Sequence, residues 1–152
     1  MGKGKYQIVE PKVCPASYRN ILGEERKDEI RDQIMQIIVS EKKYLDKDYS
    51  AKKLASDIGT NCRYISAVMA DRFHTNYNGL VNMYRINEAM TLLADDRYRS
   101  NSIEEIGEMV GFGTRQAFYA SFFRFQSITP REYRIKNLRP LKRKRRAKKE
   151  EE

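Results

Sequence analysis

One short pattern occurs twice in this 152-residue chain, and it constrains the fold more than any other feature of the sequence. Residues 54–59 (LASDIG) match residues 106–111 (IGEMVG), with an apolar residue, a small residue, a second apolar residue and a glycine at the same spacing. The offset between the copies is 52 residues. Apolar pairs then follow at an offset of 53, Ile65 and Met69 after the first copy and Phe118 and Phe122 after the second.

Each copy has the features of a helix-turn-helix. A small residue, Ala55 or Gly107, allows two helices to cross closely. A glycine, Gly59 or Gly111, readily adopts the left-handed conformation that ends the first helix. The apolar residues that follow hold the second helix against the core and leave its opposite face available to a DNA major groove. Any pair of helices can produce one such pattern, whereas two in one small chain are far more specific.

Helical periodicity continues outside the repeat, and no segment alternates convincingly at the two-residue period of a strand, so we predict an all-α fold. An amphipathic helix is expected from about Glu25 to Lys43, and a long helix from about Gly79 to Leu93. Phe125 is expected to join the apolar face of the helix that carries the second phenylalanine pair. The residues that can cap helices are Ser50, Asn61, Ser102, Thr114 and Thr129.

The net charge of +9 comes from 30 basic and 21 acidic residues and lies mostly at the two ends of the chain. Residues 1–27 carry +3 and residues 139–152 carry +5, whereas the body between them is nearly neutral. A basic segment attracts nucleic acid, but it also serves simply to keep a protein soluble. We interpret residues 1–27 as an extended arm and residues 139–152 as a disordered basic tail that adds sequence-independent attraction to phosphates.

Residues of the kind that enzymes and metalloproteins need are scarce. Cys14 and Cys62 lack the spacing of a zinc site or a disulfide framework, and His74 has no partner pattern, so we predict two thiols and a surface histidine. Because no nucleophile–base set or metal-ligand spacing occurs, we expect no enzyme activity, no cofactor and no metal. The chain also lacks an apolar run of membrane-spanning length and a signal peptide, so we expect a cytoplasmic, nucleoid-associated protein.

The second copy extends into a longer motif. Its residues are Ile103, Ile106, Val110, Gly111, Phe112, Phe118, Phe122, Thr129, Pro130, Tyr133 and Arg134. Together they resemble the signature of the AraC/XylS-family DNA-binding domain, and the stretch 84–93 (YRINEAMTLL) is similar to the linker helix of that family. The resemblance implies about seven helices in two helix-turn-helix subdomains joined by the linker helix. It also implies two recognition helices in successive major grooves, about 34 Å apart.

The resemblance covers about residues 28–137 and suggests where the parts of the chain begin and end. We place the first subdomain at residues 28–78, the linker helix at residues 79–94 and the second subdomain at residues 102–138. Two positions depart from the family pattern. Gly113 stands where the family usually has a polar residue, and Ser127 replaces a glycine, so the turn before the last helix must form without glycine.

Within the second motif we expect DNA base contacts on the face of the recognition helix opposite its phenylalanine pair. Arg115, Gln116 and Tyr119 lie on this face. Arginine pairs with guanine and glutamine with adenine, each contact being worth roughly 1–3 kcal/mol of discrimination. The alternative is an ordinary solvated helix face.

In the first recognition helix, Arg63 is the best candidate for a base contact, followed by Tyr64 and Ser66. Tyr64 could equally be a partly buried packing residue. Phosphate contacts position a protein on DNA without specifying a sequence. Arg72 is a candidate for such a contact, with a salt bridge to a nearby acid as the alternative. The full set of phosphate candidates is Arg72, Arg124 and the residues that cap the starts of the two recognition helices, Asn61 and Thr114.

We therefore expect a bacterial transcription regulator that binds double-stranded DNA sequence-specifically, with a monomer sufficient for binding and the oligomeric state open. The residues before the first helix are too few for an effector domain. Regulation is therefore expected through expression level or a partner such as RNA polymerase or another regulator. Two alternatives stay open: an architectural or accessory DNA-binding protein with little sequence preference, and a protein-interaction module that has lost DNA binding.

Overall fold

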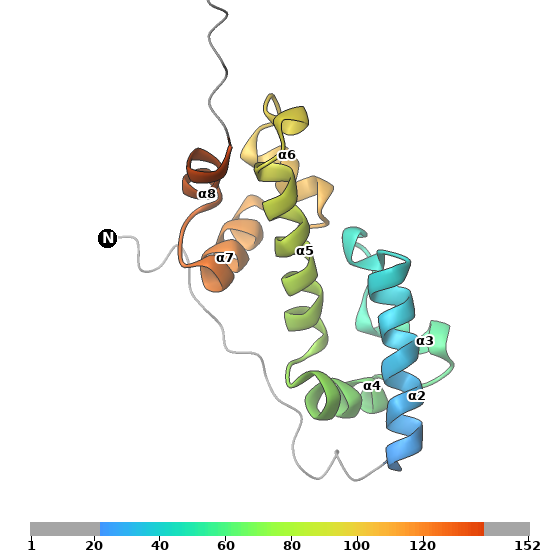
Figure 1. Cartoon of the computed structure of the whole chain (residues 1–152). Helices are drawn as coiled ribbons and strands as arrows, with labels where there is room; N and C mark the ends of the chain where they lie inside the picture. The colour runs from blue at the N-terminus through green and yellow to red at the C-terminus, as the bar shows by residue number, and fades with distance from the viewer. Residues whose placement is uncertain (1–21, 139–152) are drawn as a thin grey trace, which may run out of the picture.

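The computed structural model describes residues 22–138, and this part of the chain folds into seven α-helices without a β-strand (Figure 1). The prediction of an all-α fold with about seven helices is confirmed. Two π-helical turns, η1 (Met35–Ser40) and η3 (Met69–Phe73), continue α2 and α4, and two 3-10 helices, η2 (Lys43–Leu45) and η4 (Asp96–Tyr98), lie in loops. The α-helices are α2 (Glu24–Ile34), α3 (Ala51–Ile58), α4 (Cys62–Val68), α5 (Tyr77–Leu93), α6 (Ile103–Met109), α7 (Arg115–Gln126) and α8 (Pro130–Asn137).

The long helix α5 lies at the centre of the molecule, with the other helices on either side of it (Figure 1). Helices α2, α3 and α4 form the first half, and helices α6, α7 and α8 form the second half. Each half has its own hydrophobic cluster, and α5 contributes residues to both clusters. The chain therefore has two small cores that share one helix.

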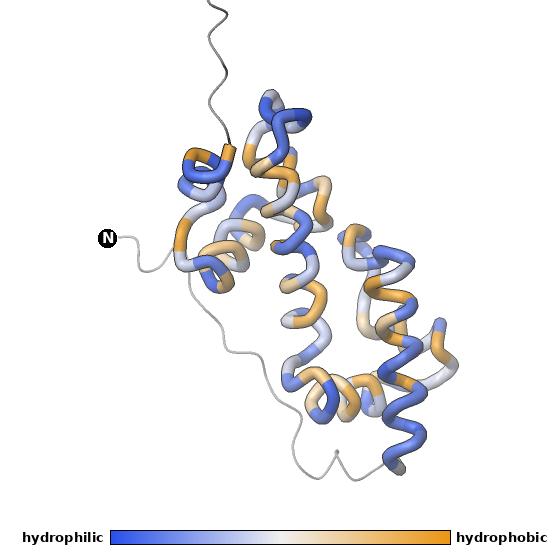
Figure 2. Tube along the Cα trace, viewed as in Figure 1, coloured by the Kyte–Doolittle hydropathy of each residue, from blue (hydrophilic) through white to orange (hydrophobic). Residues whose placement is uncertain are grey.

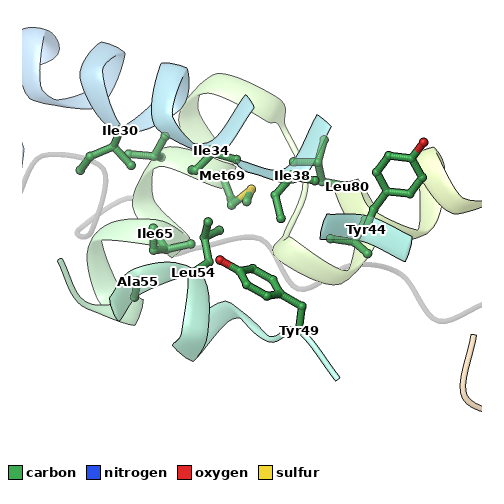
Figure 3. Close-up of a cluster of buried hydrophobic side chains, with 12 residues drawn as sticks. Ile30, Ile34, Ile38, Tyr44, Tyr49, Leu54, Ala55, Ile65, Met69 and Leu80 are labelled. Carbon is green, nitrogen blue, oxygen red and sulfur yellow. The ribbon is translucent and has the colours of Figure 1, made fainter. Parts of the chain in front are cut away.

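The first cluster combines aliphatic side chains of α2, α3 and α4 with Tyr44 and Tyr49, which come from the loop after η1 (Figure 3). Both tyrosines are buried, although the loop sequence YLDKDY is mostly polar. The second cluster is centred on Phe118 and Phe122, whose ring centroids are 6.0 Å apart. Leu45 is partly buried and packs against both clusters. The two cores are therefore joined through the η2 segment as well as through α5.

Several predicted boundaries need correction. Helix α2 begins at Glu24, so residues 24–27 are helical and not part of an extended arm. Helix α5 begins at Tyr77, two residues before the predicted start of the linker helix. Phe125 is wrong as a core residue, because it is 38% exposed and lines an open groove beside Met83. The basic tail and the arm up to residue 21 lie outside the described residues.

Candidate nucleic-acid interface

The first helix-turn-helix consists of α3 and α4. Ser50 caps α3, and Asn61 caps α4, where its Oδ1 accepts a hydrogen bond from the Tyr64 N–H at 3.0 Å. Gly59 ends α3 with a φ of 82°, in the left-handed region that glycine adopts without steric penalty. Ala55 is buried within the first cluster. The predicted caps and turn are therefore confirmed in this half.

The second helix-turn-helix consists of α6 and α7 and has the same plan. Thr114 caps α7, with its Oγ1 accepting a hydrogen bond from the Ala117 N–H at 3.1 Å. Gly111 has a φ of 104°. A Cβ atom placed on Gly107 would lie 2.7 Å from Cδ2 of Phe118. The close crossing of α6 and α7 therefore leaves little room for a side chain at position 107, in agreement with the small residue that the repeat predicted there.

The exposed face of α7 begins with Arg115 and Gln116, both solvent-exposed. The Arg115 Nε lies 2.8 Å from Oε1 of Glu104 on α6, in an ion pair whose side chains are 58% and 47% exposed. The Arg115 guanidinium also lies over the ring of Tyr119, 4.7 Å from its centroid. Tyr119 is partly buried and packs against the second cluster. The arginine is thus held between a carboxylate and an aromatic ring at the start of α7.

Glu104 is a residue of this surface that sequence reasoning missed. It is the second residue of α6, where an acidic side chain is common because the helix dipole favours negative charge. Nothing in the sequence therefore distinguishes it from Glu105. The contact with Arg115 depends on the crossing of α6 and α7, which brings two residues eleven positions apart into an ion pair.

The exposed face of α4 carries fewer of the predicted residues. Arg63 and Ser66 are solvent-exposed. Tyr64 is partly buried and packs against the first cluster. This agrees with the packing alternative for Tyr64, and its base contact stays a prediction.

Arg72 is part of an ion-pair network that joins η3 to the start of α2. Its guanidinium is 19% exposed and pairs with Asp28 at 3.0 Å and Asp71 at 2.7 Å, and also with Glu24. Lys27 is 3% exposed and pairs with Asp71 at 3.1 Å. The hydrophilic residues at the start of α2 are visible in Figure 2. Arg72 is thus engaged by three carboxylates, and we replace its predicted phosphate contact with a structural role.

The charges of this network shift one another's protonation. Hydrogen bonds from Arg72 and Lys27 lower the pKa of the Glu24 carboxyl. The hydrogen bond to Asp71 raises the pKa of Lys27. Each group is therefore held in its charged form more firmly than in the unfolded chain.

The remaining phosphate candidates lie at the start of α4 and at both ends of α7. Asn61 and Thr114 are exposed caps, so each sits beside the first backbone N–H groups of its recognition helix. Arg124 lies near the other end of α7, partly buried, with its guanidinium 5.9 Å from the centroid of the Phe125 ring. It lines a groove of about 450 Å³ between α7, the start of α5 and η3.

Within residues 22–138, neither a metal-holding cluster nor a membrane-spanning helix is found. Between residues 22 and 138, His, Cys, Asp and Glu side chains nowhere gather in a group of three that could hold a metal ion. No helix in this range is both long enough and apolar enough to cross a bilayer. Cys62 is an exposed thiol, and Cys14 lies outside the described residues.

Comparison with known proteins finds one protein family that this chain resembles. A family model described as a helix-turn-helix domain matches residues 54–136, more than half of the chain. Among curated proteins, no sequence matches. Solved structures with the same fold include three at 21–24% identity.

The first is a transcriptional regulator from Chromobacterium violaceum, described as containing an AraC-type DNA-binding domain. It is 24% identical with a TM-score of 0.61, over 74% of this chain and 98% of that one. The second is the C-terminal domain of AraT, a response regulator from Geobacillus stearothermophilus, at 21% identity and a TM-score of 0.64 over 76% of this chain and 91% of that one. The third is the C-terminal domain of the response regulator yesN from Fusobacterium nucleatum, at 24% identity and a TM-score of 0.58 over 73% and 99%.

Proposed function

Because the chain belongs to the family of AraC-type helix-turn-helix DNA-binding domains, we propose that it is a transcription regulator that binds double-stranded DNA with sequence preference. The observation that carries the proposal is the surface at the start of α7. There Arg115 and Gln116 are exposed on a helix whose opposite face is buried through Phe118 and Phe122. In this proposal α7 and α4 enter successive major grooves on one side of the DNA.

The two exposed side chains of α7 supply the base contacts that the chemistry allows. The guanidinium of Arg115 pairs with O6 and N7 of guanine, and the amide of Gln116 pairs with N6 and N7 of adenine. The ion pair with Glu104 meets Arg115 at Nε. An end-on contact to guanine through the two terminal amino groups is compatible with this ion pair, whereas a side-on contact through Nε is not.

The first recognition helix and the caps complete the proposed interface. Arg63 and Ser66 are the base-contacting residues that we propose on α4. Asn61 and Thr114 place the first N–H groups of the two recognition helices toward DNA phosphates, since helix N-termini favour anions. Arg124 adds a phosphate contact near the end of α7. The Tyr119 ring lies against the Arg115 guanidinium and contributes to base recognition by holding that side chain in place.

An architectural role is the second candidate. It is favoured by the small number of exposed reading residues on α4 and by the position of the excess positive charge, which lies in the terminal segments of the sequence. Charge in such segments increases affinity for any duplex without adding sequence preference.

Selection of bound sequences from random duplex DNA tests the proposal. The selected duplex is then titrated against a scrambled one at several salt concentrations. We expect a defined motif and much tighter binding to the selected duplex. Equal binding to both supports the architectural role, and absence of binding at low salt contradicts DNA binding altogether.

Substitution of Arg115 by alanine tests the assignment of the reading residue. We expect Arg115→Ala to relax the preference at one base pair by about 5- to 150-fold, the equivalent of roughly 1–3 kcal/mol. The control is Arg97→Ala, which removes an exposed arginine in the loop after α5 and should leave the preference unchanged. If Arg115→Ala weakens all sequences equally, Arg115 contacts phosphate and the base assignment is wrong.

A further inference from the structure

Arg85 lies in the middle of α5 and connects the two halves of the molecule. Its Nε donates a hydrogen bond to the Tyr44 carbonyl oxygen at 2.6 Å, and its Nη2 donates to the Asp46 carbonyl oxygen at 3.2 Å. Its guanidinium carbon lies 5.6 Å from the centroid of the Phe112 ring. Burial lowers the pKa of Arg85, as expected for a charge withdrawn from water.

The partners of Arg85 come from opposite halves. Tyr44 belongs to η2 and to the first cluster, whereas Phe112 follows α6 and belongs to the second cluster. Gly111 places the two halves in direct contact. A Cβ atom on Gly111 would lie 2.7 Å from the Tyr44 carbonyl oxygen, 2.8 Å from that of Leu45 and 2.9 Å from the Arg85 Nε. The turn of the second helix-turn-helix therefore rests on the backbone of the η2 segment.

This junction matters because the two halves contact α5 differently. Helices α6, α7 and α8 all make extensive contact with α5, whereas among the elements of the first half the most extensive contact comes from η2. The hydrogen bonds of Arg85 therefore hold one of the attachments of the first half to α5, beside Leu80 and Val81 of α5, which are buried in the first cluster. The planar guanidinium of Arg85 donates hydrogen bonds to two carbonyl oxygens and lies near one aromatic ring at the same time. The single ammonium group of a lysine cannot make all of these contacts.

We propose that Arg85 is a positioning residue that fixes the distance and rotation between α4 and α7, and thereby makes the protein selective for one spacing between its two half-sites. This proposal rests on the proposed function, because it assumes that both helices bind DNA. One additional base pair between half-sites moves the second by about 3.4 Å and rotates it by about 34°. A rigid pair of reading helices cannot follow this change, whereas a loosely joined pair can.

Binding to duplexes of altered spacing tests the proposal in the full chain. The selected duplex is compared with versions in which one base pair is inserted or removed between the half-sites. For the wild type we expect a loss of about 100-fold, because simultaneous engagement of two linked modules is lost when geometry forbids it. For Arg85→Met we expect weaker binding to the best spacing and a loss of less than about tenfold on changing it.

Two variants and a second measurement keep the outcomes separate. Arg85→Lys retains the charge and the stem but not the fork, and should behave like Arg85→Met. Arg97→Met removes an exposed arginine outside the junction and should retain the spacing preference of the wild type. Residual dipolar couplings of the α4 and α7 amides without DNA should fit one alignment tensor in the wild type and in Arg97→Met, and two different tensors in Arg85→Met.

The proposal is overturned if Arg85→Met keeps both the spacing preference and the single tensor. If the wild type selects no DNA sequence, the proposed function and the spacing role both fail. The dipolar couplings still report in that case whether Arg85 holds the halves together. If Arg85→Met does not fold, Arg85→Lys decides, and a folded Arg85→Lys with unchanged spacing preference refutes the role.

Discussion

Gly107 of α6 lies against the Phe118 ring of α7, and Gly107→Ala tests whether this packing restricts which residue position 107 can hold. The added Cβ atom would lie 2.7 Å from Cδ2 and 2.9 Å from Cγ of Phe118. These distances fall roughly 0.6–0.8 Å short of an ordinary carbon–carbon contact of about 3.5 Å. The Phe118 ring is fully buried between Phe112 and Phe122, with ring centroids 5.3 Å and 6.0 Å away, so it has little room to move.

The expected effect is a net loss of stability. Overpacking of a filled core costs about 1–3 kcal/mol. Replacing glycine by alanine inside a helix contributes about 0.8–1.0 kcal/mol in the opposite direction. We therefore expect Gly107→Ala to lower the free energy of unfolding by about 1 kcal/mol, measured by urea denaturation with an unchanged m-value. Gly113→Ala is the control, because a Cβ atom there would meet nothing within 4 Å.

The first half of the chain supplies a compensating change. At the positions of Gly107 and Phe118, the first repeat has Ala55 and Ile65. The first residue of the pair is therefore larger in the first repeat, and the second residue is smaller. Both residues of the first pair are buried in the first cluster (Figure 3). The double variant Gly107→Ala with Phe118→Ile should thus be more stable than the sum of the single changes predicts, by about 1 kcal/mol or more. Additivity within about 0.5 kcal/mol would refute this explanation of the contact.

Three further predictions concern other parts of the structure. Ser127 ends α7 with a φ of 61°, a conformation that costs a residue other than glycine about 1 kcal/mol. Ser127→Gly should therefore raise the free energy of unfolding, measured by urea denaturation, by up to about 1 kcal/mol. The pKa of Glu24 is lowered from 4.5 by its basic partners, so its contribution to stability is complete above that pH and is lost as the pH falls through the folded pKa. Thermal unfolding from about pH 7 to about pH 3 should therefore show a smaller acid-induced decrease for Glu24→Gln than for the wild type, and equal decreases would contradict the role of this carboxylate. Glu104→Gln should increase affinity for any duplex and reduce discrimination at the base pair that Arg115 contacts. Glu108→Gln, one turn further along α6, should increase the affinity for any duplex but leave the discrimination at that base pair unchanged. If the two variants behave identically in duplex titrations, Glu104 does not orient Arg115.

Local signals predicted most of the fold. The five predicted caps lie at helix starts, and each accepts the expected backbone hydrogen bond. The two predicted turn glycines have positive φ values, and the glycine at the α6–α7 crossing is in close contact with a phenylalanine. These features depend on residues a few positions apart, which a sequence displays directly.

Features that depend on distant contacts were not predictable. The loop after η1 reads as polar, yet Tyr44 and Tyr49 are buried, because α2, α3 and α5 enclose them only in the folded chain. Arg72 reads as a surface arginine, but its partners include Asp28, 44 residues away in the sequence. The helical pattern of α2 and α4 likewise gave no indication that each ends in a π-helical turn.

In the candidate site too, features set by residues close in the sequence were predictable, and features set by distant contacts were not. The sequence indicated the exposed Arg115 and Gln116, because their place in the repeat follows from helical spacing. It could not separate Tyr64 from the reading residues, because an aromatic residue at the edge of a helix face can pack or project. It also gave no role to Glu104 or Arg85, whose contacts arise from how helices and loops meet in three dimensions.

The seating of Gly111 on the backbone of the η2 segment also limits how this protein can be recombined with its relatives. Either half looks like an exchangeable module, since each has a complete helix-turn-helix and its own cluster. The contact surface of the second half, however, is built partly from the Tyr44 and Leu45 carbonyl groups of the first half. A chimera that joins the second half to a foreign first half should therefore work only if its loop before α3 follows the same backbone path. In such hybrids, compatibility is decided by the course of a loop and not by the match between recognition helices.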